Sequence, residues 1–261
     1  MRTLLCSLAL LVGLAGAARG ERLVDVRQIA RGGYLAPRFA PDGGALLVSG
    51  PKLRGLYLAA LAGGAVKQLT ADEGAGVNPR FVARGAVAYT AQQGGVRREL
   101  VIERDGSVRA AASASQPVAF SRDDRMYAIG RGGNLLRVGS GDRFFGEVIA
   151  PDGDKVAFLG LTTGLYVYTR STGTLVHVGR GTAPAWSPDS RRLVFERTED
   201  DGHEIVGSDL YIYDLASARA AAVTTTDRVT ERRPSFSPDG ASLAWDDGEG
   251  AVYLGRLEVS P

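Results

Sequence analysis

Residues 234–245, which read PSFSPDGASLAW, decide the fold of this chain. The proline of the central Pro-Asp-Gly fits the second position of a type I turn, the aspartate can accept a hydrogen bond from its own backbone, and the glycine tolerates a positive φ. Apolar residues stand at alternate positions on both sides of the turn, at Phe236, Leu243 and Trp245. Such alternation is typical of strands with one buried face, so the stretch predicts a β-hairpin.

The same unit recurs along the chain. Close copies occur at 184–195 (PAWSPDSRRLVF), 37–48 (PRFAPDGGALLV) and 147–158 (EVIAPDGDKVAF), and degraded ones at 79–89 and 119–129. An aromatic-rich strand such as 210–213 follows each hairpin, and a weaker fourth strand follows most. Four short strands repeated about every 40 residues are typical of propeller blades. We therefore predict an all-β, six-bladed β-propeller of four-stranded antiparallel blades; an open β-sandwich is the alternative.

Two further features concern the ring. The last repeat ends after its third strand, near Leu257, and residues 22–29 form a strand without a repeat of its own. Adding this N-terminal strand to the last blade would close the ring and remove an exposed sheet edge. The third repeat is short, since 29 residues separate Asp123 from Asp152. It has room for three strands, or for a very short fourth.

The start of the chain has the pattern of an export signal. Arg2 precedes an apolar stretch from Leu4 to Ala15, and small residues follow it. This layout is typical of a secretory signal peptide, and the apolar stretch is shorter than the ~20 residues of a membrane-spanning helix. We expect residues 1–20 to be a cleaved signal and residues 21–261 to be the propeller, in the periplasm or secreted.

Composition excludes several classes of protein. With 31 Lys and Arg against 29 Asp and Glu, the formal net charge of +2 gives no electrostatic case for nucleic-acid binding. One Cys and two His argue against a disulfide framework, and against a thiolate or multi-histidine metal site. No G-x-S-x-G or H-E-x-x-H motif occurs. We therefore predict no catalytic residue, no metal and no cofactor.

The remaining polar residues have structural interpretations. His177 lies in a strand pattern and is expected to be exposed, and the loop 199–204, with His203, is expected to be a solvated acidic loop. The four aspartates of the Pro-Asp turns are explained by the turns themselves: Asp42, Asp152, Asp189 and Asp239.

The repeated P-x-F-S-P-D-G-x-x-L-A-W pattern, followed by residues 209–215 (DLYIYDL), resembles the WD40-like repeat of TolB-type β-propellers over about residues 23–258. The resemblance implies a six-bladed ring in the cell envelope, with an envelope protein or a peptidoglycan-associated lipoprotein as partner. Family members of that type carry an α/β domain before the propeller, whereas here the repeats begin almost at the expected cleavage site. We therefore expect a stand-alone, monomeric propeller.

Propeller geometry indicates where a partner binds. Loops between blades, and those between the middle strands of a blade, share one face, and variable loops on a rigid scaffold often carry function. Arginine and tyrosine are favoured interface anchors. We therefore predict a non-catalytic interaction module that binds through this face; the alternative is a small-molecule or glycan-processing lyase or hydrolase with a site at the central channel mouth. The candidate binding residues are Tyr34, Asn78, Arg80, Gln116, Arg143, Arg180, Glu231, Arg232 and Arg233, and the face also carries Asp72, Glu73 and the loop 199–204.

Overall fold

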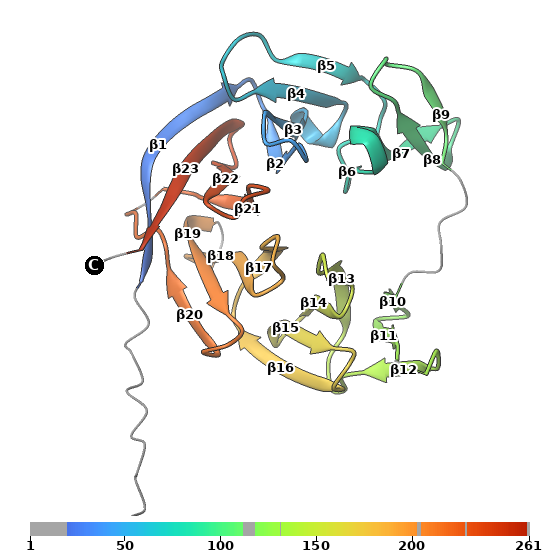
Figure 1. The fold of residues 1–261 in the computed structure, drawn as a ribbon, viewed down its shortest axis with the longest axis vertical. Helices are drawn as coiled ribbons and strands as arrows, with labels where there is room; N and C mark the ends of the chain where they lie inside the picture. The colour runs from blue at the N-terminus through green and yellow to red at the C-terminus, as the bar shows by residue number, and fades with distance from the viewer. Residues whose placement is uncertain (1–19, 112–117, 131, 203–204, 228, 260–261) are drawn as a thin grey trace, which may run out of the picture.

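A computed structural model describes residues 20–111, 118–130, 132–202, 205–227 and 229–259. Six small antiparallel sheets stand around a ring (Figure 1). In five of them the strands follow sequence order from the centre outward, and in the sixth the N-terminal strand is the outermost. The predicted all-β, six-bladed propeller is confirmed. The predicted signal, residues 1–20, lies outside the described part of the chain except for residue 20.

Blades 1 to 3 come first in the chain. Blade 1 contains β2 (Leu35–Phe39), β3 (Ala45–Ser49), β4 (Leu56–Ala60) and β5 (Lys67–Thr70), with the short 3-10 turn η1 (Pro51–Leu53). Blade 2 contains β6 (Arg80–Phe81), η2 (Ala83–Gly85), β7 (Val87–Gln93), β8 (Val96–Ile102) and β9 (Val108–Ala110). Blade 3 contains β10 (Ala119–Arg122), β11 (Arg125–Ile129) and β12 (Leu135–Val138). The short third repeat thus has three strands among the described residues.

Blades 4 to 6 complete the ring. Blade 4 contains β13 (Phe144–Ile149), β14 (Lys155–Gly160), β15 (Gly164–Thr169) and β16 (Thr174–Gly179). Blade 5 contains β17 (Thr182–Trp186), β18 (Arg192–Asp200), β19 (Ile205–Asp214) and β20 (Arg219–Ala222). Blade 6 contains β21 (Arg232–Phe236), β22 (Ser242–Asp246), β23 (Ala251–Val259) and, as its outermost strand, β1 (Glu21–Arg31).

The N-terminal strand closes the ring as predicted. β1 pairs with β23 in antiparallel register from Glu21↔Val259 to Arg31↔Ala251, and the first and last strands lie side by side in Figure 1. Glu21 also forms an ion pair of 2.6 Å with Arg192 of blade 5. The first strand therefore completes one blade and contacts another.

The hairpin turns have the geometry that their sequence predicts. The Asp239 carboxylate accepts hydrogen bonds from the Ser237 hydroxyl, at 2.5 Å, and from the Ala241 N–H, at 3.0 Å. Asp189 is bonded in the same way in blade 5, and in both turns these hydrogen bonds lower the pKa of the aspartate. These aspartates stabilise turns.

The core lies between neighbouring blades rather than inside any one sheet. Between blades 4 and 5, for example, Ala157 and Val167 pack against Leu193 and Phe195. Comparable buried clusters join blades 1 and 2, 3 and 4, 5 and 6, and 6 and 1. No cluster among the described residues spans blades 2 and 3. Because the blades pack against one another, the loops that join their strands are held in fixed positions.

Candidate functional site

Most of the predicted residues lie in loops between blades or at the start of the next strand. Tyr34 lies between β1 and β2, Asn78 precedes β6, Arg143 lies between β12 and β13, and Arg180 between β16 and β17. Arg80 begins β6, Glu231 directly precedes β21, and Arg232 and Arg233 begin it. Gln116 lies outside the described residues. The eight described positions are therefore distributed around the ring and do not line one cavity.

Four of these side chains contact neighbours within the fold. The ring of Tyr34 packs edge-on against Tyr57, with centroids 5.2 Å apart. The Asn78 Oδ1 accepts a hydrogen bond of 3.3 Å from Arg38. Two arginines form exposed ion pairs, Arg80 with Glu99 and Arg143 with Asp124, the latter at 2.9 Å. Exposed pairs of this kind contribute at most about 1 kcal/mol each.

Arg232 and Arg233 turn inward. Arg232 Nη2 lies 3.1 Å from Glu196 Oε1, and the Arg233 N–H donates to Glu196 Oε2 at 2.6 Å. The Arg233 guanidinium makes a two-point contact with Asp246, which also accepts a 2.9 Å hydrogen bond from the Ala36 N–H. Both carboxylates are buried. The network therefore joins blades 5, 6 and 1, and partnering two buried charges is the role that these arginines have in the fold.

Glu231 is also buried, with 5% of its surface exposed. Its N–H donates to the Ser208 carbonyl oxygen at 3.1 Å, and its Oε1 accepts a weak 3.4 Å bond from the Thr226 hydroxyl. Burial of the carboxylate raises the pKa of Glu231, and the nearby Asp209 charge adds to the rise. Glu231 thus belongs to the interior of the loop region rather than to its surface.

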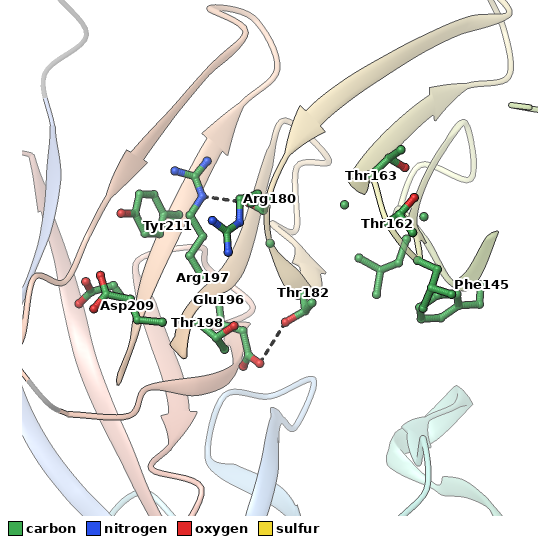
Figure 2. A pocket seen from close by; sticks show the side chains of 16 residues that line it. Phe145, Thr162, Thr163, Arg180, Thr182, Glu196, Arg197, Thr198, Asp209 and Tyr211 are labelled. Atoms are coloured by element: carbon green, nitrogen blue, oxygen red, sulfur yellow. Dashed lines mark hydrogen bonds between the residues drawn. The ribbon is translucent and has the colours of Figure 1, made fainter. Parts of the chain in front are cut away.

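Arg180 lines a hollow between blades 4 and 5 (Figure 2). The pocket has a volume of about 630 Å³. Its walls come from the start of β13, the β14–β15 turn, the β16–β17 loop and the facing strands β18 and β19. The residues that carry its chemistry are Phe145, Leu161, Thr162, Thr163, Arg180, Thr182, Arg197, Glu199, Asp209 and Tyr211.

Arg197 is held firmly in this pocket. Its guanidinium carbon lies 4.1 Å from the centre of the Tyr211 ring and 5.4 Å from that of Phe195. Its Nε donates a 2.9 Å hydrogen bond to the Arg180 carbonyl oxygen (Figure 2). A cation stacked on aromatic faces is stabilised by about 0.5–2 kcal/mol, depending on exposure. The pocket therefore presents a fixed positive charge beside the exposed side chain of Arg180.

The opposite wall is fixed by the Asp142 carboxylate. It accepts hydrogen bonds from the backbone N–H groups of Thr162 and Thr163, at 3.0 and 2.9 Å, and from the Thr163 hydroxyl, at 2.6 Å. These bonds lower the pKa of Asp142, so the group is ionised at neutral pH. His177 contacts the Thr163 carbonyl oxygen at 2.7 Å through Nε2. His177 is an exposed strand residue as predicted, and it also supports this turn.

Sequence reasoning identified Arg180 and missed the rest of the pocket. Arg197 and Tyr211 are strand residues from the middle of blade 5, where alternation predicts packing and not a binding surface. Phe145 and Leu161 are exposed apolar residues at the rim. The lining as a whole offers cations, hydroxyl groups, apolar surface and the three carboxylates of Glu196, Glu199 and Asp209. That mixture suits a peptide better than a small ion.

The opposite face has a larger hollow of about 1170 Å³ between blades 1 and 2. It is lined by Pro-Asp turn residues and by apolar side chains such as Leu58, Leu69 and Phe81. No group of three or more His, Cys, Asp or Glu in the described ranges could hold a metal ion. Within those ranges no helix is long and apolar enough to cross a membrane.

Comparison with known proteins places the fold. A protein described as TolB from Agrobacterium tumefaciens superposes with a TM-score of 0.60 at 15% identity, covering 93% of this chain and 99% of that one. A gluconolactonase from Xanthomonas campestris is also similar, with a TM-score of 0.59 at 12% identity, covering 91% of each chain. At such identities the likeness shows the propeller fold and does not by itself fix an activity.

Comparison of the sequence alone finds little similarity to known proteins. No family model matches the chain. Dipeptidyl-peptidase 5 of Porphyromonas gingivalis is 32% identical over 77 residues, which amount to 28% of this chain and 11% of that enzyme. The match thus spans about a tenth of the curated relative, and the likeness is confined to a small part of it.

Proposed function

We propose that this protein is a non-catalytic interaction module of the cell envelope, exported to the periplasm or beyond, that binds an envelope protein through the pocket between blades 4 and 5. The observation that carries the proposal is the position of Arg197, stacked on Tyr211 and bonded to the Arg180 backbone. Arginine and aromatic residues dominate binding energy at protein interfaces. A rigid cation costs little entropy when a partner binds.

The chemistry of the pocket defines the partner segment. Arg180 and Arg197 would bind carboxylate groups of the partner, and the exposed Phe145 and Leu161 would contact apolar side chains. The partner would therefore present an extended or looped segment that carries acidic and apolar residues together. An envelope protein or a peptidoglycan-associated lipoprotein is the partner class that the TolB-like resemblance implies.

Capture of a partner from envelope extract tests the proposal. Immobilised wild-type protein is expected to retain a specific protein, and Arg180→Glu together with Phe145→Ala is expected to lower the retained amount at least tenfold. Lys67→Glu, an exposed charge reversal on the opposite face, is the matched control and should retain the partner fully. Arg232 and Arg233 are unsuitable for this purpose because their replacement would disturb buried carboxylates.

Two outcomes would contradict the proposal. Equal retention by the wild type and the double variant would exclude this pocket as the binding surface. Turnover of an oligosaccharide or a lactone by the purified protein would favour the catalytic alternative. The proposed export is tested separately by sequencing the N-terminus of protein recovered from the periplasm, which should begin at Glu21.

A further inference from the structure

Blade 3 differs from the other five blades in its outer edge. Each of the other sheets has four strands, and β12 is the outermost strand of a three-stranded sheet. No described strand pairs with its outer side. In an antiparallel sheet, every second residue of an edge strand directs its N–H and C=O away from the sheet. Among the described residues, the edge of β12 therefore has hydrogen-bonding groups without a strand partner at the place where a fourth strand lies in the other blades.

The neighbouring blade shows what a fourth strand covers. In blade 4, Ala157 pairs with Val167, and Val167 pairs with Val176 of the outer strand β16. In blade 3, Ala128 pairs with Leu136 in the same way, and the described chain has no strand beyond it. Val167 is 2% exposed, whereas Leu136 is 36% exposed. Leu135 beside it is 53% exposed. The apolar surface that a fourth strand would bury is thus present and uncovered.

One face of this sheet also carries positive charge. Cross-strand pairs share a face, so the pairs Arg122↔Arg125 and Tyr127↔Arg137 place three arginines on one side. Leu135 lies on that side as well, opposite Ile129. No described residue forms an ion pair with Arg125 or Arg137. The face therefore alternates apolar and cationic side chains along the open edge.

We propose that the edge of β12 binds an extended, acidic and apolar segment of a partner protein, which adds the fourth strand to blade 3. Backbone hydrogen bonds to the edge would give affinity, Leu136 would contact apolar side chains on one face of the added strand, and Arg137 would select carboxylates on the other. This surface is separate from the pocket between blades 4 and 5. The inference therefore does not depend on the proposed function.

A second copy of the chain is a poorer occupant of this edge. Antiparallel pairing of two β12 edges keeps equivalent faces on the same side of the joined sheet. That arrangement would place Arg137 of both copies on the same face of adjacent strands. Like charges on neighbouring strands are destabilising. Charge complementarity favours an acidic strand instead.

A peptide of alternating glutamate and valine tests the inference, with a lysine and valine peptide as its charge-reversed control. The acidic peptide is expected to bind the full-length protein and to slow hydrogen exchange of the β12 amides. Leu136→Lys combined with Arg137→Glu is expected to weaken binding at least tenfold, because it removes the apolar contact on one face of the edge and reverses the charge on the other. Arg219→Glu, on the outer strand β20 of blade 5, is the matched control and should leave binding unchanged. Circular dichroism spectra and melting temperatures would establish that both variants fold.

Four results would overturn the inference. The first is the absence of binding by the acidic peptide, and the second is equal binding of both peptides. The third is protection of amides elsewhere than in residues 134–139. Concentration-dependent dimers in sedimentation, abolished by the same double variant, would assign the edge to self-association and also contradict it.

Discussion

Replacing Arg233 with alanine should destabilise the protein more than any other change at its surface loops. Arg233 donates two hydrogen bonds to the fully buried Asp246 carboxylate, which would keep only the backbone bonds from Ala36 and Gly248. Removing one partner of a buried ion pair costs about 3–5 kcal/mol, because the other charge is left uncompensated. In a chain of this length that loss lowers the melting temperature by roughly 10 °C.

The assay is urea unfolding of the wild type and the variant, followed by circular dichroism. Arg180→Ala is the control, because its exposed side chain should contribute less than about 0.5 kcal/mol. The double variant Arg233→Met with Asp246→Leu removes both charges and should recover most of the lost stability, since apolar replacements of buried pairs are often neutral. A loss below about 1 kcal/mol for Arg233→Ala would refute the reasoning that this arginine neutralises a buried charge.

Three further predictions concern the ring and its loops. Deleting residues 21–31 should abolish cooperative thermal unfolding, because β23 and the core of blade 6 lose their outer strand; a single sharp transition in the truncated protein would contradict this. Phe195→Ala should cost about 3–5 kcal/mol of unfolding free energy because the ring is fully buried. Phe145→Ala should cost far less because that ring is exposed. Equal losses would show that the cluster between blades 4 and 5 is not well packed. Glu231→Gln should raise the melting temperature at pH 7 relative to the wild type and have little effect at pH 4. Burial raises the pKa of Glu231, so the wild type loses stability as the pH rises from the pKa of the unfolded state through that of the folded state. Scanning calorimetry across that pH range checks the sign, and a destabilised variant at pH 7 would contradict it.

The fold could be predicted from the sequence because the residues that specify each hairpin are close together in the chain. A Pro-Asp-Gly turn and its flanking alternation specify one hairpin, and six copies specify the ring. The strand β1 followed from what the last repeat lacked. The spacing of 29 residues between Asp123 and Asp152 marked blade 3 as short but left three strands or a very short fourth open, and the described residues form three.

The site was harder to predict from the sequence, because a residue's place in a loop does not determine whether its side chain points into solvent or into the fold. Arg232 and Arg233 have the composition of an exposed basic loop, yet they bind Glu196 and Asp246, which lie far along the chain or in another strand. Arg197 and Tyr211 sit in regular strands and meet only when β18 and β19 pair. Contacts of this kind depend on tertiary packing, and a repeat pattern carries no information about them.

The pairing of Glu21 with Val259 has a consequence for how the molecule comes into being. The ribosome makes β1 before β23, so blade 6 cannot assemble until β23 has emerged. Closing a loop of that size is entropically costly and slow. The edge of β1 therefore stays without its partner until β23 has been made, and a chaperone that shields this edge would raise the yield of finished rings.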